Sequence, residues 1–180
     1  MVNDDEIIKL LGKTETKRKG FELLVSQYGE KLYWQVRRLV IVHEDADDVV
    51  QNALIKAWTN IDDFQNRSKL YTWLSRIAIN EALDFLRKKK NKQASSTDED
   101  VVLASQLIAD DYFDGDETQA QLQEAISRLP VVQRTVFNMR YFDEMKYSEI
   151  SKVLKTSEGA LKTSYHLAVK KIEDFFNNHD

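Results

Sequence analysis

The sequence contains no cysteine, a single proline (Pro130) and five glycines in 180 residues. Without cysteine, the chain forms neither disulfides nor thiolate metal sites, and it has no cysteine nucleophile. No apolar run approaches the length of a membrane span, and the N-terminus opens with acidic residues rather than with a signal peptide. These absences predict a cytoplasmic protein that does not insert into membranes.

Patterns typical of β-strands are missing as well. The hydrophobic content of 42% is nevertheless enough for real cores, and apolar residues recur at helical spacing in most of the chain. We therefore expect an all-α fold with two small helical domains, residues 1–92 and 120–180.

Charge is distributed unevenly along the chain, and the distribution is more informative than the net charge of −4. Residues 64–92 carry eight basic and two acidic side chains, whereas residues 93–127 carry nine acidic side chains and no basic one. The composition of 93–119, rich in acidic and small residues, predicts a flexible acidic linker between the two domains.

Three amphipathic helices are expected in the first domain, at about residues 21–42, 45–61 and 71–89. For the second, the spacing predicts an inward stripe and a polar outer face. The predicted inward residues are Val50, Leu54, Ala57, Trp58 and Ile61.

The last fifty residues predict a helix-turn-helix. Tyr147 to Leu154 reads as a short helix, residues 155–157 as a tight turn, and Ser157 as the N-cap of the next helix. The inward stripe of that helix is Leu161, Tyr165, Ala168, Ile172 and Phe175. Such a unit can place its second helix in a major groove, although an ordinary helical hairpin has the same pattern.

Enzymatic activity finds no support in the residues. The three histidines, His43, His166 and His179, lie far apart in sequence, and no phosphate-binding, dinucleotide-binding or zinc-protease motif is present. We expect a protein that is not an enzyme, with no cofactor and no metal. A helical adaptor without a nucleic-acid role remains an alternative, although the basic segment 64–92 argues against it.

Three stretches together resemble a known family. DADDVVQNALIKAW (45–58), FQNRSKLYTWLSRIAINEALDFLRKKK (64–90) and the C-terminal helix-turn-helix are similar to regions 2 and 4 of the extracytoplasmic-function group of bacterial sigma factors. The resemblance implies a protein that binds core RNA polymerase through its β′ clamp and β subunits, directs it to promoter DNA and helps melt the duplex. The alternative is a helix-turn-helix regulator that binds DNA without joining polymerase.

The resemblance also implies roles for particular residues. The polymerase-binding residues would be Asp45, Asp47, Asp48, Gln51 and Asn52, although many relatives have an acid at the position of Asn52. Reading and melting of the −10 element would fall to Asn66, Arg67, Ser68, Lys69, Tyr71, Trp73, Arg76, Asn80, Arg87 and Lys88. Core packing is the competing interpretation for Tyr71 and Trp73.

For the −35 element, the implied readers lie on the last helix. They are Glu158, Gly159, Lys162, Thr163, His166 and Lys170. The chain departs from the family at Ser164 and Leu167, where many relatives have arginine, and at Lys155, where glycine is usual and a positive φ would cost strain. Many relatives bind an anti-sigma factor that covers both domains, and the residues leave the existence of such a partner open.

Overall fold

In the computed structural model, residues 3–92 and 117–178 are described, and every regular element in them is helical. The predicted linker lies outside these residues, apart from 117–119, which begin a helix. The N-terminal half, residues 3–92, contains α1 (Asp4–Leu11), α2 (Lys17–Val40), α3 (His43–Asn60), a 3-10 turn η1 (Ile61–Asp63) and α4 (Leu70–Lys92). The C-terminal half, residues 117–178, contains α6 (Glu117–Ser127), α7 (Val131–Tyr141), α8 (Tyr147–Leu154) and α9 (Glu158–Asn177).

Helix α2 is the central element of the N-terminal half, because it packs against α1, α3 and α4. Its residues Leu24, Leu32 and Val36 are fully buried. Gly20 lets α1 cross closely, since a Cβ at this position would lie only 2.9 Å from Leu10 Cβ and from the backbone nitrogen of Leu11.

The predicted inward face of α3 is partly wrong. Ala57 of α3 and Ile61, which begins η1, are buried as expected, but the rest of the core face of α3 is made by small residues. Val50 and Leu54 are only partly buried, and Trp58 is 40% exposed. Helix α3 has two apolar stripes, and the one with small side chains faces α2 and α4 because it allows closer packing. Those small core residues are Ala46, Val49 and Ala53.

The predicted helix-turn-helix is confirmed to the residue. Helix α8 covers Tyr147–Leu154, and the Ser157 hydroxyl accepts a hydrogen bond from the Ala160 backbone N–H at 3.3 Å. Lys155 adopts the left-handed conformation, with φ 52° and ψ 41°, where glycine is usually favoured. On α9, Leu161, Ala168 and Ile172 are buried as predicted.

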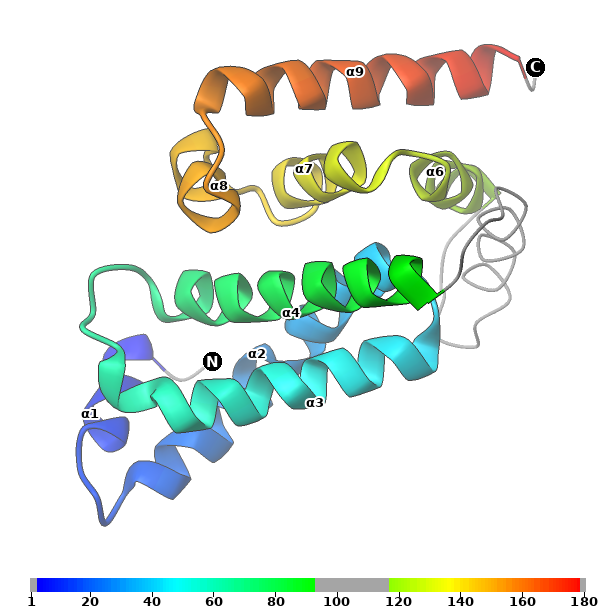
Figure 1. The fold of residues 1–180 in the computed structure, drawn as a ribbon. Helices are drawn as coiled ribbons and strands as arrows, with labels where there is room; N and C mark the ends of the chain where they lie inside the picture. Colours follow the sequence, from blue (N-terminus) through cyan, green and yellow to red (C-terminus); the bar gives the residue numbers. More distant parts are fainter. Residues whose placement is uncertain (1–2, 93–116, 179–180) are drawn as a thin grey trace.

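The two halves pack against each other. Helix α7 contacts α2, and α8 contacts α4, so that α9 forms the layer farthest from the N-terminal half (Figure 1). Val136, Met139 and Ile150 of the C-terminal half belong to the same buried cluster as the N-terminal core. Within the described residues, none of the helices combines the length and apolarity needed to cross a bilayer.

Candidate protein and nucleic-acid interfaces

The polar face of α3 is available to a partner. Asp48, Gln51 and Asn52 are exposed on it. Asp47 is exposed too, with its carboxylate 3.4 Å from His43 Nε2. Asp45 is less available, because it accepts a hydrogen bond from Lys89 at 2.8 Å and its side chain is only 22% exposed. The acids at the start of α3 also match the positive end of the helix dipole.

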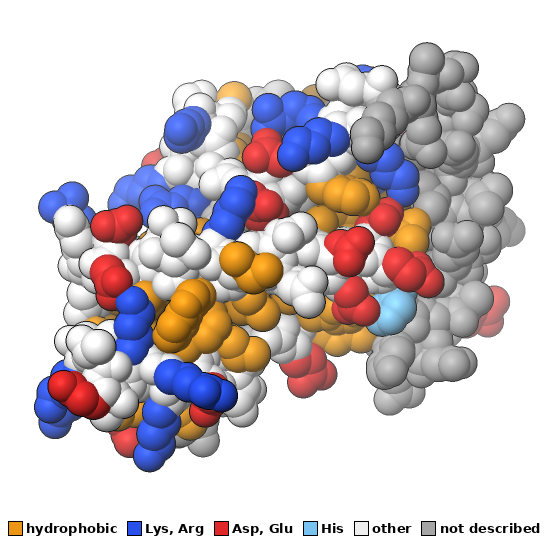
Figure 2. Space-filling view, turned by 60° about the horizontal axis from the view of Figure 1, so that its bottom comes forward, with side chains coloured by type: hydrophobic (Ala, Val, Ile, Leu, Met, Phe, Trp, Pro, Cys, Tyr) orange, Lys and Arg blue, Asp and Glu red, His pale blue; other side chains and the backbone are white. Residues whose placement is uncertain are grey.

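An apolar hollow adjoins this polar face, and the sequence interpretation missed it by assigning three of its residues, Val50, Leu54 and Trp58, to the core. The hollow has a volume of about 640 Å³. Hydrophobic side chains gather there over α3, beside the acidic cluster near the histidine (Figure 2). Ile55 is 58% exposed, and Trp58 packs edge-to-face on Phe21, with ring centroids 5.1 Å apart. The sequence did contain a signal for this hollow, because α3 has a second apolar stripe at positions i, i+4 and i+8. The lining residues are Phe21, Asp47, Val50, Gln51, Leu54, Ile55 and Trp58.

The basic segment presents a loop and one face of α4. The side chains of the loop residues Asn66, Arg67, Ser68 and Lys69 are all exposed, and Asn66 has a positive φ of 54°. On α4, four of the predicted residues line the solvent side. Arg87 is held by an ion pair with Asp84 at 2.6 Å. These exposed residues of α4 are Arg76, Asn80, Arg87 and Lys88.

The two aromatic residues of this segment with a predicted DNA role, Tyr71 and Trp73, are partly and almost fully buried, respectively. Trp73 is 7% exposed and packs on Phe64, with ring centroids 5.4 Å apart. Tyr71 contacts the ring of Tyr28, and the Lys31 ammonium lies 4.2 Å from its centroid. The Trp73 ring is therefore nearly enclosed, whereas Tyr71 is half-buried beside Tyr28 and Lys31.

The outer face of α9 carries all six predicted −35 readers. The side chains of Lys162, Thr163, His166 and Lys170 are exposed, as are Glu158 and Gly159 at the start of the helix. Tyr165 belongs to the core instead, because its ring stacks on Phe137 at 5.7 Å. This division matches the facing predicted from the apolar stripe.

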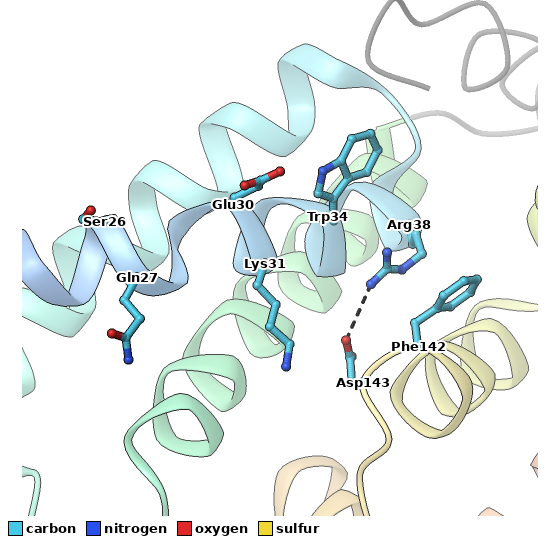
Figure 3. A pocket seen from close by; sticks show the side chains of 8 residues that line it. All are labelled: Ser26, Gln27, Glu30, Lys31, Trp34, Arg38, Phe142 and Asp143. Carbon is cyan, nitrogen blue, oxygen red and sulfur yellow. Dashed lines mark ion pairs between the residues drawn. The ribbon is translucent and has the colours of Figure 1, made fainter. Parts of the chain in front are cut away.

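A polar cluster joins the two halves beside a hollow of about 330 Å³ (Figure 3). Gln35 donates to Asp143 Oδ2 at 2.5 Å and accepts from the Ser75 hydroxyl at 2.8 Å. Arg38 lies 3.5 Å from Asp143 Oδ1, and the Asn138 amide donates to the Arg38 carbonyl at 3.2 Å. We call these five residues the seam.

Burial dominates the electrostatics of the seam. The pKa of Asp143 is raised by desolvation, although the hydrogen bond from Gln35 and the charges of Arg38 and Lys31 oppose the shift. Desolvation likewise lowers the pKa of Arg38 and raises that of Tyr71. Both ionised groups of the seam are therefore held at a cost in free energy.

Comparison with known families identifies the class of protein. Residues 24–92 match the sigma-70 region 2 family, and residues 119–172 match the sigma-70 region 4 family. These ranges coincide with the bulk of the two halves, including α3, α4 and the helix-turn-helix.

The chain belongs to the extracytoplasmic-function RNA polymerase sigma factors. It is 35% identical to the ECF RNA polymerase sigma factor SigW of Bacillus subtilis over 157 residues, covering 82% of this chain and 83% of the relative. It is 30% identical to the ECF RNA polymerase sigma-E factor of Haemophilus influenzae, covering 87% of each. The chain is thus a sigma factor that binds core RNA polymerase and directs it to specific promoters, and a regulator acting without polymerase is not favoured.

Solved structures share the fold. A sigma factor RpoE in complex with the anti-sigma factor NepR from Bartonella quintana superposes with a TM-score of 0.70 at 20% identity, covering 88% of this chain and 98% of that one. CnrH in complex with the cytosolic domain of CnrY gives 0.69 at 22% identity, covering 99% and 100%. These similarities support the all-helical architecture.

Proposed function

We propose that the chain performs its sigma-factor function through three surfaces. The polar face and apolar hollow of α3 bind core polymerase, the 66–69 loop and α4 bind the −10 element, and the outer face of α9 binds the −35 element. The domain limits are 1–92 for region 2, 93–119 for the acidic linker and 120–180 for region 4.

The observation that carries the polymerase assignment is the pairing of polar and apolar groups on α3. A buried apolar centre with a polar rim is the usual anatomy of a specific protein interface. Trp58 and Ile55 supply the apolar centre, and Asp47, Asp48 and Gln51 supply the rim. Exposed aromatic residues in such a position are frequent hot spots of binding.

A pull-down with core polymerase, followed by in vitro transcription, tests this assignment. Asp48→Lys combined with Gln51→Ala should weaken core binding while the thermal midpoint stays unchanged. Glu15→Lys is a matched control, since Glu15 is equally exposed but lies in the turn between α1 and α2. Wild-type affinity in the double variant would assign polymerase binding to another surface.

The −10 assignment is supported by exposed polar and basic groups that extend from the loop along α4. Arg76, Arg87 and Lys88 can neutralise backbone phosphates, while Asn80 can bond to a base edge. Because Trp73 is nearly enclosed, a base-stacking role for it requires the N-terminal half to rearrange. Because Asn80 is proposed to bond to a base edge, Asn80→Ala should reduce the permanganate reactivity of unpaired thymines in the open promoter. Asn91, which is also exposed on α4, is the control, and Asn91→Ala should leave that reactivity unchanged.

An anti-sigma factor is a further proposed partner. Among the solved structures that share the fold, one is a sigma factor RpoE in complex with the anti-sigma factor NepR, and another is CnrH in complex with the cytosolic domain of CnrY. The apolar hollow on α3 is a surface that such a partner could cover, which would block polymerase binding directly. Co-purification of the full chain from its own host identifies the partner, and polymerase should displace it.

A further inference from the structure

The exposed face of α9 has an apolar centre. Leu167 is 42% exposed in the middle of the helix, on the side opposite the buried Leu161, Ala168 and Ile172. Thr163, four residues earlier, is exposed on the same face. Side chains separated by four positions are neighbours on a helix, with Cβ atoms about 5–6 Å apart.

The hydroxyl of Thr163 is already engaged as a donor. It donates to the Gly159 carbonyl at 3.1 Å, four residues back in the same helix. What Thr163 offers outward is therefore its methyl group and an acceptor lone pair, but no free donor for an acceptor atom on a base.

The polar groups around this centre are lysines and a histidine. Helix α9 contains no arginine, so the bidentate guanidinium contact with guanine that dominates direct readout is unavailable. The Lys162 ammonium lies 5.8 Å from the Tyr147 ring centroid, over α8 rather than straight outward. The face thus combines few directional donors with an apolar ridge, defined as Leu167 and the methyl group of Thr163.

Only one group in the major groove complements an apolar ridge. Among the base edges, the 5-methyl group of thymine is the apolar feature, and it distinguishes T·A from every other pair. We propose that Leu167 and the Thr163 methyl group select the −35 element by packing against thymine 5-methyl groups. This inference rests on the proposed assignment of α9 to the −35 element.

The test removes methyl groups one at a time from both partners. Holoenzyme assembled from the full chain and core polymerase first selects duplexes from a library randomised at the −35 element. Each selected thymine is then replaced by deoxyuridine, which lacks only the 5-methyl group. We expect about a fourfold loss of affinity at one or two positions, equivalent to ~0.8 kcal/mol for one buried methyl.

Matched protein variants assign the contact. Leu167→Ala should abolish the difference between thymine and deoxyuridine at one position, whereas Leu167→Met should retain most of it. Thr163→Ser removes only the methyl group and should abolish the difference at a neighbouring position. Val132→Ala, which shortens a 63% exposed side chain on α7, should leave every difference unchanged.

The possible outcomes distinguish a failure of methyl reading from a failure of the proposed assignment of α9 to the −35 element. If the library yields no enriched −35 sequence, the assignment of α9 fails and the inference fails with it. If a sequence is enriched but deoxyuridine changes affinity by less than about 1.5-fold at every position, well below the loss expected per methyl, the assignment stands and methyl reading is overturned. Methyl discrimination that persists in both Leu167→Ala and Thr163→Ser also overturns it.

Discussion

The contacts within each half and the contacts between the halves differ in chemistry. Inside the N-terminal half, Leu24, Leu32 and Ile79 are fully buried among other apolar side chains. Between the halves, Val136 and Ile150 extend that apolar core, but at the seam buried polar atoms face one another. Among the described residues, Arg38 Nε and Asp143 Oδ1 have no hydrogen-bond partner there. Since a buried polar atom without a partner costs about 1–3 kcal/mol, we expect the seam to be the weak part of the contact between the halves, beside the apolar cluster that they share.

Removing a core side chain should have the largest effect. Leu32→Ala in α2 creates a cavity in the N-terminal core, and we expect the free energy of unfolding to fall by about 2–5 kcal/mol. Urea denaturation monitored by circular dichroism measures the change. A loss below about 1 kcal/mol, less than the cost of a typical cavity, would mean that the N-terminal core is no better packed than the seam.

Disrupting the seam should separate the halves rather than unfold them. Asp143→Ala removes the acceptor of Gln35 and the partner of Arg38, and should weaken closure by about 1–3 kcal/mol. Because the chain has no cysteine, labels attached through Asn60→Cys and Lys171→Cys report the separation by energy transfer.

The control for the seam is a variant that keeps a hydrogen-bond acceptor. Asp143→Asn can still accept from Gln35, so its label distance should change less than that of Asp143→Ala. A cooperative loss of helix content in Asp143→Ala, without a change in label distance before unfolding, would contradict the distinction between seam and core.

Relieving backbone strain in the helix-turn-helix should stabilise one half alone. Lys155 occupies the left-handed region, which costs a residue with a Cβ about 1 kcal/mol or more. Lys155→Gly should recover roughly that amount in thermal melts of the C-terminal half. The distance between the two labels should stay the same, and a change in it would show that the turn and the seam are coupled.

Acidification should tighten the seam. Burial raises the pKa of Asp143 above its usual 3.8, so the closed arrangement binds this proton more strongly than the open one. Closure is therefore favoured fully below pH 3.8 and loses this contribution as the pH rises through the raised pKa. The labelled chain should become more compact on acidification within that window, and Asp143→Asn should lose this response.

The sequence predicted local features such as a helix cap and the buried stripe of α9. It did not predict which of the two apolar stripes of α3 faces the core. The N-cap Ser157 and the buried Leu161, Ala168 and Ile172 follow from capping and helical period, which depend on near neighbours. The face of α3 was misassigned because two apolar stripes compete, and only the partners of the helix decide which is buried. Because the other stripe is buried, Ile55 and Trp58 are exposed to solvent.

The seam left no signal in the sequence for a related reason. Gln35 and Asp143 are separated by 108 positions, and isolated polar residues have no periodicity that would indicate burial. Their pairing depends on how two complete halves fit together. The roles of Asn80, Lys162 and the other surface residues stay predictions, because they depend on a partner molecule.

The layering of α4, α8 and α9 also sets a length scale for promoter recognition. Helices in contact lie about 8–10 Å apart, so α4 and α9, with α8 between them, are separated by roughly 20 Å. The −10 and −35 elements are named for positions that differ by roughly 25 base pairs, so they lie about 85 Å apart at 3.4 Å per pair. On the proposed assignment of α4 to the −10 element and of α9 to the −35 element, we expect the closed chain to reach one element at a time and recognition of a whole promoter to require the seam to open. Every 1.4 kcal/mol or so of closing free energy would then lower the apparent affinity for the complete promoter about tenfold, and we expect the strength of the seam to set how readily the chain initiates transcription.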